Sequence, residues 1–212
     1  MTEDKSCFTC VDCGALHCEK RNSAFPEFCL TTKLTEEDLS EIKELYQDPE
    51  NRRIAAVSAE IESDYYGRYT RVEEIMEFAR RMGYHKIGLA TCAGLIRESR
   101  IFTRILRRHG FEVYGVVCKV GSIDKDKVGV PKDKQKTGPV MCNPILQARL
   151  LNKEKTDLNV VIGLCVGHDS LFYKYSQSVT TTLVTKDRVL AHNPCAALYQ
   201  AESYYKRLLQ DD

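Results

Sequence analysis

The chain has 212 residues, enough for one substantial hydrophobic core and a small additional segment. Its 31 Lys and Arg residues nearly balance 30 Asp and Glu residues, which gives a formal net charge of +1 and disfavours nucleic acid as a partner. No apolar run approaches the ~20 residues that cross a bilayer, and the polar N-terminus lacks the apolar core of a signal peptide. We therefore expect a cytoplasmic protein with no membrane partner. The sequence does not indicate an oligomeric state.

Ten cysteines are a high number for such a chain. In a reducing compartment disulfides are the less common use of cysteine, so metal binding and catalysis gain weight. Taken singly, each cysteine could also be a small buried hydrophobic residue. The grouping of the cysteines along the chain is therefore what carries information.

The opening segment, residues 1–33, is the first such group. It contains five cysteines with the spacing C-x2-C-x2-C-x4-C-x10-C, namely Cys7, Cys10, Cys13, Cys18 and Cys29. The segment has too few apolar residues for a core of its own, so a bound metal would have to supply the folding energy. We predict a tetrahedral Zn²⁺ site, with Cys7 spare, whose ligands are Cys10, Cys13, Cys18 and Cys29.

Other ligand sets are open for the same segment. Cys7, Cys10 and Cys13 form a run like that of iron–sulfur ferredoxins, with Cys18 or Cys29 as the fourth ligand. A histidine, His17, could also replace a thiolate. Unligated thiols would instead leave a segment prone to oxidation. An iron–sulfur redox or sensor protein is thus an alternative to the zinc protein.

Residues 34–84 are expected to form a helical lead-in. Thr35, followed by acidic residues, is typical of a helix N-cap. Pro49 suits the first position of a second helix, which continues to the Tyr65 region. Thr70 begins a third helix, which ends at Gly83.

Strands and helices alternate from residue 85 onward. The expected strands span residues 86–91, 112–118, 157–164 and 179–185, with 188–191 as a candidate fifth. The expected helices span residues 95–109 and 169–176, and a last one starts at Asn193. This alternation predicts an α/β fold, a three-layer Rossmann-like and mostly parallel sheet. We divide the chain into a metal-binding segment, 1–33, and an α/β domain, 34–212, with its βα core at 85–212.

Residues 121–138 interrupt this alternation. The segment is rich in lysine, aspartate and glycine and has few large apolar residues. Such a charged run is commonly a solvated surface. A loop of this length inside a compact domain can also be a lid, and its lysines would then approach an anionic ligand.

Cysteine and histidine recur where the predicted strands end. The stretch VVIGLCVGHDS, residues 160–170, is a buried strand that runs into Cys165, His168 and Asp169. Cys92 and Cys118 follow two other strands. Because the carboxyl ends of parallel strands meet at one edge of a sheet, where ligands usually bind, we expect these groups to converge.

Two Asn-Pro dipeptides add to this edge. Asn143 and Asn193 each read as an N-cap followed by proline at the first helical position. Cys142 immediately precedes the first dipeptide, and His192 precedes the second. The partial positive charge of a helix N-terminus favours thiolate over thiol.

The leading interpretation is a metal-binding protein whose N-terminal zinc lies beside this pocket, and three uses of the pocket compete. A thiolate-dependent enzyme on a small anionic substrate would use Cys92 or Cys165 as the nucleophile, activated by His168 or His192. Alternatively the thiols ligate a second metal or an iron–sulfur cluster, or they line a site that receives a metal or cofactor for transfer. If none of these holds, the thiols only pack in the core. Asp169 is also accounted for as a helix N-cap. The remaining residues expected to line the pocket are Cys118, Cys142, Asn143, Asp169, His192 and Asn193.

Several blocks together resemble a known family. The blocks are CVDCGALHC with Phe28-Cys29, ATCAGL, VMCNPILQA, LCVGHDSLF, TTTLVTKDRVLAHNP and AALY. The sequence resembles an uncharacterised family of predicted metal-binding proteins, domain-of-unknown-function family 1847, over essentially the whole chain. The resemblance implies a metal site at the positions that match the family's N-terminal cysteines, Cys10, Cys13, Cys18 and Cys29. It implies no established reaction, and Cys7 and Cys195 are additions to the family's pattern.

Overall fold

The computed structural model of the protein describes residues 8–20 and 24–210, so Cys7 lies outside the described residues. The chain forms two compact units, Met1–Ala56 and Val57–Asp212. The division into residues 1–33 and 34–212 stays a prediction.

The first unit consists of short elements. A 3-10 turn spans Cys10–Asp12, helix α1 spans His17–Lys20, a second 3-10 turn spans Thr31–Lys33 and helix α2 spans Glu36–Leu45. The predicted N-cap at Thr35 is confirmed, because the Thr35 hydroxyl accepts a hydrogen bond from the Asp38 N–H at 3.1 Å. None of the described residues between 8 and 56 is buried. The described residues of this part of the chain therefore form no hydrophobic core of their own.

Helices α3 (Pro49–Tyr65) and α4 (Arg71–Met82) follow, as the sequence predicts. The Thr70 N–H donates to the Glu73 carboxylate at 2.8 Å, which fixes the start of α4. Gly83 ends α4 in the left-handed conformation, with φ of 78°. The face of α4 that packs against the core carries Ile75, Met76, Ala79 and Met82.

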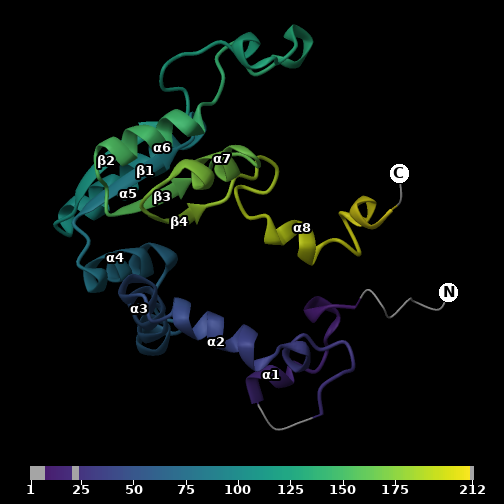
Figure 1. The fold of residues 1–212 in the computed structure, drawn as a ribbon. Helices are drawn as coiled ribbons and strands as arrows, with labels where there is room; N and C mark the ends of the chain where they lie inside the picture. Colours follow the sequence, from purple (N-terminus) through teal and green to yellow (C-terminus); the bar gives the residue numbers. More distant parts are fainter. Residues whose placement is uncertain (1–7, 21–23, 211–212) are drawn as a thin grey trace. The chain divides into compact units, whose positions relative to one another are not determined.

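The core of the second unit is a parallel sheet of four strands, β1 (Lys86–Thr91), β2 (Glu112–Val117), β3 (Leu158–Ile162) and β4 (Val179–Val184). Their order is β2-β1-β3-β4, and every neighbouring pair is parallel (Figure 1). The predicted α/β class with a parallel sheet is therefore confirmed.

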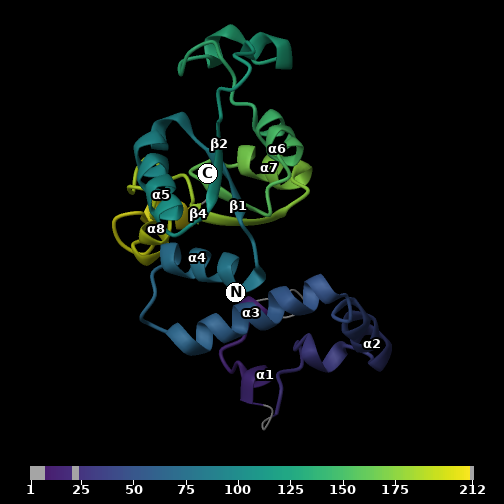
Figure 2. The same ribbon diagram turned by 90° about the vertical axis from the view of Figure 1, so that its left-hand side faces the viewer.

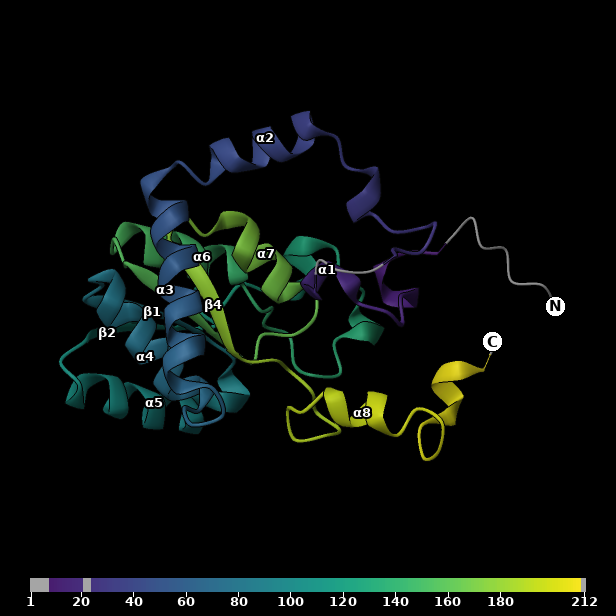
Figure 3. The same ribbon diagram turned by 90° about the horizontal axis from the view of Figure 1, so that it is seen from below.

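Helices cover both faces of this sheet. Helix α5 (Ile96–Arg108) packs with α4 on one face, while α6 (Pro144–Lys153) and α7 (His168–Tyr175) pack on the other. Figure 2 shows α5 on one side of the strands and α6 and α7 on the opposite side, and Figure 3 shows α7 and α5 on either side of β4. Successive residues of a strand face opposite sides, so Leu89 packs toward α5 and Ala90 toward α6. The result is three layers.

The predicted strand at 188–191 is wrong, because this stretch forms a turn. The Asp187 carboxylate accepts the N–H groups of Val189 and Leu190, both at 2.8 Å, which curls the backbone instead of extending it.

The last helix also differs from the prediction. Helix α8 spans only Cys195–Tyr199, and Pro194, not Asn193, stands at its N-cap. The Asn193 N–H donates to the Leu190 carbonyl at 2.9 Å, so Asn193 still belongs to the preceding turn. A short 3-10 helix, Lys206–Leu209, follows near the end of the chain.

Across residues 8–20 and 24–210, we find no helix with the length and apolar character needed to cross a bilayer.

Candidate functional site

The order in which the chain adds strands to the sheet reverses between β1 and β3. The chain leaves β1 through α5 on one face to reach β2, and returns through α6 on the other face to reach β3. Ligands in open α/β sheets commonly bind beyond the carboxyl ends of the strands at such a reversal. Cys92 follows β1 directly, and its N–H donates to the Ile162 carbonyl at the end of β3, at 3.0 Å.

Cys118 lies beside Cys92. The register of β1 and β2 pairs Thr91 with Val117, so the next residues of the two strands are Cys92 and Cys118. The Cys118 N–H donates to the Thr91 carbonyl at 2.8 Å, and the Ala93 N–H donates to the Cys118 sulfur at 3.3 Å. The strand pairing therefore continues into the two cysteines.

Cys142 reaches the same place from the start of α6. The Asn143 N–H donates to the Cys118 carbonyl at 2.7 Å, which sets Cys142 next to Cys118. Asn143 is the N-cap that the sequence predicts, because its side-chain oxygen accepts the Leu146 N–H at 3.0 Å. Pro144 occupies the first helical position.

His168 completes a continuous row of four side chains. Cys118 interacts with both Cys92 and Cys142, and Cys142 also interacts with His168, because each of these groups shifts the pKa of its neighbour. We call Cys92, Cys118, Cys142 and His168 the thiol row. Cys118 is 2% exposed, whereas Cys92, Cys142 and His168 are partly exposed.

The three cysteines of the row differ in protonation state. The neighbouring Cys118 and His168 side chains lower the pKa of Cys142 to about 3, and the Lys119 ammonium adds to the effect. Cys118, with help from the Gly94 N–H and Lys186, also lowers the pKa of Cys92 to about 5. The pKa of Cys118 is raised, because it faces these two sulfurs and is buried. Cys118 is therefore the protonated member of the row.

Histidine and lysine supply the positive charge. The hydrogen bond to the Cys142 thiolate raises the pKa of His168, which favours the imidazolium. A methyl group at Gly94 would lie 3.4 Å from Lys186 Nζ and 3.8 Å from Cys92 Sγ, so the ammonium lies close to that sulfur. Lys119 Nζ donates to the Val140 carbonyl at 2.6 Å.

The other predicted pocket residues lie outside the row. Arg188 donates to the Cys165 sulfur at 2.9 Å, and His192 Nδ1 accepts the Asp187 N–H at 3.2 Å within the turn described above. Cys195 is exposed. His168 therefore contacts Cys142, whereas the sequence analysis considered Cys92 and Cys165 as its partners.

The interpretation of Asp169 as a helix N-cap is wrong. Helix α7 begins one residue earlier, at His168, and Gly167 is its N-cap with φ of 84°. The Asp169 carboxylate accepts the N–H of its neighbour Ser170 at 2.8 Å. The glycine at 167 allows the left-handed conformation that starts the helix early.

The sequence analysis missed Gln147, which lies beneath the row on α6. The side chain is fully buried, and its Nε2 donates to the Val116 carbonyl at 2.7 Å and to the Thr91 carbonyl at 3.2 Å. These carbonyls are at the ends of β2 and β1, so Gln147 holds the two strand ends together. Its Oε1 has no hydrogen-bond partner. The available signal was an amide side chain between the apolar residues Leu146 and Ala148 near the start of α6.

The N-terminal cysteines form no metal site among the described residues. The Cys13 N–H donates to the Cys10 carbonyl at 3.3 Å, and the rings of Phe8 and Phe28 meet edge to face at 5.5 Å. Within residues 8–20 and 24–210, no three His, Cys, Asp or Glu side chains are grouped to hold a metal ion. Four thiols suit zinc by their chemistry, but they are not gathered, so the zinc site stays a prediction.

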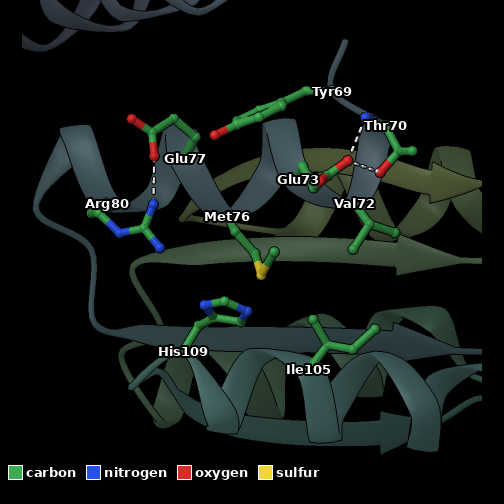
Figure 4. Close-up of a pocket in the computed structure, with 9 residues that line it drawn as sticks. All are labelled: Tyr69, Thr70, Val72, Glu73, Met76, Glu77, Arg80, Ile105 and His109. Carbon is green, nitrogen blue, oxygen red and sulfur yellow. Dashed lines mark hydrogen bonds and ion pairs between the residues drawn. The ribbon is translucent and has the colours of Figure 1, made fainter. Parts of the chain in front are cut away.

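A surface pocket lies between α4 and α5, away from the thiols (Figure 4). The Glu73 carboxylate accepts hydrogen bonds from the backbone N–H and the hydroxyl of Thr70, and Glu77 forms an ion pair with Arg80. None of the pocket's lining residues is a cysteine. The row of sulfur groups, and not this pocket, is therefore the candidate site.

Fold and site together define a doubly wound α/β protein with thiols and an imidazole at the carboxyl edge of its sheet. The chain belongs to the family described as "Protein of unknown function (DUF1847)", which matches residues 29–183. It is 50% identical over 185 residues to "Uncharacterized protein MJ0455" of Methanocaldococcus jannaschii, which covers 87% of this chain and 95% of that protein. The family match includes the whole thiol row but only Cys29 of the four predicted zinc ligands.

Proposed function

We propose that the protein is a thiolate-dependent enzyme in which Cys142 attacks a small anionic electrophile. The observation that carries this proposal is the placement of Cys142 just before α6 and of His168 at the start of α7, where each shifts the pKa of the other toward its charged form. A thiolate next to an imidazolium is the activated form of a cysteine nucleophile. The sulfur is partly exposed, so a small molecule in solvent can reach it.

Each group in the site has a role in this chemistry. The Cys142 sulfur forms a covalent bond to the substrate, and the bond to the leaving group breaks. The His168 imidazolium can donate its proton to the leaving group, as a general acid does. Lys119 and Lys186 lie near the two thiolates and favour an anionic substrate.

Cys142 is a better candidate than the two cysteines considered from the sequence. Cys92 is a thiolate next to Lys186 but has no histidine among the groups that shift its pKa. Cys165 contacts Arg188 and lies outside the row. Of these three cysteines, Cys142 is the one that combines a lowered pKa with a neighbouring imidazolium that can protonate the leaving group.

A competition experiment tests this proposal. The full-length protein is treated with a limiting amount of iodoacetamide at neutral pH, and the modified cysteines are identified by peptide mass spectrometry. We expect Cys142 to be modified first, and Cys142→Ser to remove the fast phase, while the exposed control Cys195→Ser leaves it unchanged. If Cys142 reacts no faster than Cys195, the proposal is wrong.

We further propose that the N-terminal segment holds a zinc ion through Cys10, Cys13, Cys18 and Cys29, in a cytoplasmic protein. The edge-to-face contact of Phe8 and Phe28 brings the segment of Cys10 near that of Cys29, which supports this proposal. Desolvation opposes ionisation of Cys29, but hydrogen bonds from Thr32 and Thr31 outweigh it, so its pKa is lowered. The thiolate is the form that binds metal.

A further inference from the structure

We infer that Cys118 is the resolving thiol of this site, which forms a disulfide with Cys142 and makes small anionic disulfides the substrates. The inference rests on the proposed role of Cys142 as nucleophile. It adds a second reacting residue and a substrate class to that proposal.

The backbone places the two cysteines in neighbouring segments. Asn143 donates to the carbonyl of Cys118 at 2.7 Å, so the chain segments that carry the two cysteines lie side by side. Cys118 belongs to the buried cluster between the sheet and helices α6 and α7, and Cys142 packs against the same cluster. A disulfide joins cysteines whose Cα atoms are about 4.4–6.8 Å apart, so two cysteines in adjacent, hydrogen-bonded segments are candidates for one.

Cys118 and Cys142 are also the two ends of one excursion of the chain, residues 119–141, which extends away from the sheet in Figures 1 and 2. The two arms of this excursion are paired at its base. The Met141 N–H donates to the Ile123 carbonyl and the Lys125 N–H to the Pro139 carbonyl, both at 2.8 Å. This pairing returns Cys142 to Cys118 and keeps it there.

The difference in burial indicates which of the two thiols reacts with the substrate first. Cys142 is partly exposed and can meet a substrate, whereas Cys118 is 2% exposed and can meet only its neighbours in the row. A protonated Cys118 does not compete for substrate. Once Cys142 carries a substrate fragment, it no longer has a negative charge, so ionisation of Cys118 becomes easier. The buried thiol is then in position to attack the Cys142 sulfur.

The two steps balance. The Cys142 thiolate attacks a disulfide RSSR, a new sulfur–sulfur bond joins Cys142 to RS, and RS⁻ leaves. Cys118 then attacks the Cys142 sulfur, the Cys118–Cys142 disulfide forms, and the second fragment leaves as RSH with the proton of Cys118. The substrate is reduced by two electrons and the two cysteines are oxidised. An external dithiol reduces the protein disulfide for the next cycle.

Positive charge near the row selects the substrate class. The excursion 119–141 contains six lysines against three aspartates, a net charge of +3. Lys119 influences Cys142, and Lys186 influences Cys92. A small disulfide that carries carboxylates meets these ammonium groups as it approaches Cys142.

The test uses the reduced full-length protein and glutathione disulfide, each half of which carries a net negative charge. Trypsin cuts after Lys119 and Lys136, so Cys118 and Cys142 fall in separate peptides and a disulfide between them is seen as a linked pair. We measure glutathione release and map the peptides without reduction. The variants are Cys118→Ser and Cys92→Ser, with Cys195→Ser as the control.

In the unmodified protein and in Cys92→Ser and Cys195→Ser, we expect release of both halves and a linked Cys118–Cys142 pair. In Cys118→Ser we expect release of one half and a glutathione adduct that stays on Cys142. A lasting adduct in the unmodified protein, or a Cys92–Cys118 pair in its place, would overturn the resolving role but leave Cys142 as the nucleophile. No modification of Cys142 at all would overturn both. If Cys118→Ser fails to fold, the peptide map of Cys92→Ser decides the result.

Discussion

Cys118 and His168 together set the charge of the candidate nucleophile. The lowered pKa of Cys142 means that its thiolate is present above that pKa and is lost only as pH falls through it. The raised pKa of His168 means that its imidazolium is present below that pKa and is lost as pH rises through it. The charged pair therefore exists between the two values, a range that includes the ordinary imidazole value of about 6.5.

We predict that His168→Gln slows alkylation of Cys142 most at acidic pH. The substitution removes one of the hydrogen bonds that stabilise the thiolate, so the pKa of Cys142 rises toward the ordinary value of about 8.5. The rate at about pH 5.5 should fall by roughly tenfold once the pKa reaches about 6.5, because each unit of pKa above the pH is a factor of ten in thiolate. The matched control is His109→Gln, an exposed histidine outside the row. Equal pH profiles for the two variants would contradict the role of His168.

Gly163 supports the turn beneath Cys92, and we predict that Gly163→Ala is strongly destabilising. Its φ is 66°, and an added Cβ would lie 1.9 Å from the Cδ1 of Leu95, a buried side chain. We expect a loss of about 1–2 kcal/mol from the backbone conformation and about 1–3 kcal/mol from overpacking. Gly110 has φ of 88° with nothing near its added Cβ, so Gly110→Ala should lose the backbone contribution alone. Denaturant unfolding compares the two variants, and equal losses would show that Leu95 gives way freely.

At the scale of elements, α6 delivers Cys142, and its N-cap is the point to test. We predict that Asn143→Ala lowers the free energy of unfolding by about 0.5–2 kcal/mol, because the Leu146 N–H loses its acceptor. Asn143→Asp keeps an acceptor at the same place and should recover most of that loss. Urea unfolding measures both. If alanine and aspartate are equally destabilising, the cap does not act through this hydrogen bond.

The regular elements were predictable from local pattern, while their ends were predictable only where one cap dominates. Strand β1 follows from its apolar run, and α4 follows from Thr70 and Gly83. The stretch 188–191 has the composition of a strand, but the Asp187 carboxylate accepts two of its backbone N–H groups and holds it in a turn. Helix α7 starts at His168 because of the conformation of Gly167, which no residue pattern specifies.

At the scale of the whole molecule, the sequence indicates which residues lie at the sheet edge but not which of them meet. The register of β1 and β2 makes the pairing of Cys92 and Cys118 foreseeable. The pairing of Cys142 with His168 depends on how the excursion 119–141 returns and on where α7 begins. Both are set by contacts between residues far apart in the sequence, so periodicity carries no signal for them.

The N-terminal unit gives a separate prediction. Protein purified without oxygen should be colourless and contain about one zinc per chain, as expected for four thiolate ligands. The double substitution Cys10→Ser and Cys13→Ser should remove the zinc, while Cys195→Ser should keep it. Elemental analysis and visible absorbance measure the result. A brown protein that contains iron and sulfide would show an iron–sulfur cluster and contradict the zinc site. Protein without metal would contradict both.

The central claim is that Cys142 is a thiolate at neutral pH, and a titration of ultraviolet thiolate absorbance tests it most directly. The measurement compares the unmodified protein with Cys142→Ser from about pH 8 downward, since an ordinary thiol loses its thiolate below a pKa of about 8.5. The account predicts an absorbance difference of one thiolate that persists well below pH 7, because the pKa of Cys142 is lowered to about 3. A difference that vanishes between about pH 8 and pH 7, as for an ordinary thiol, would contradict it.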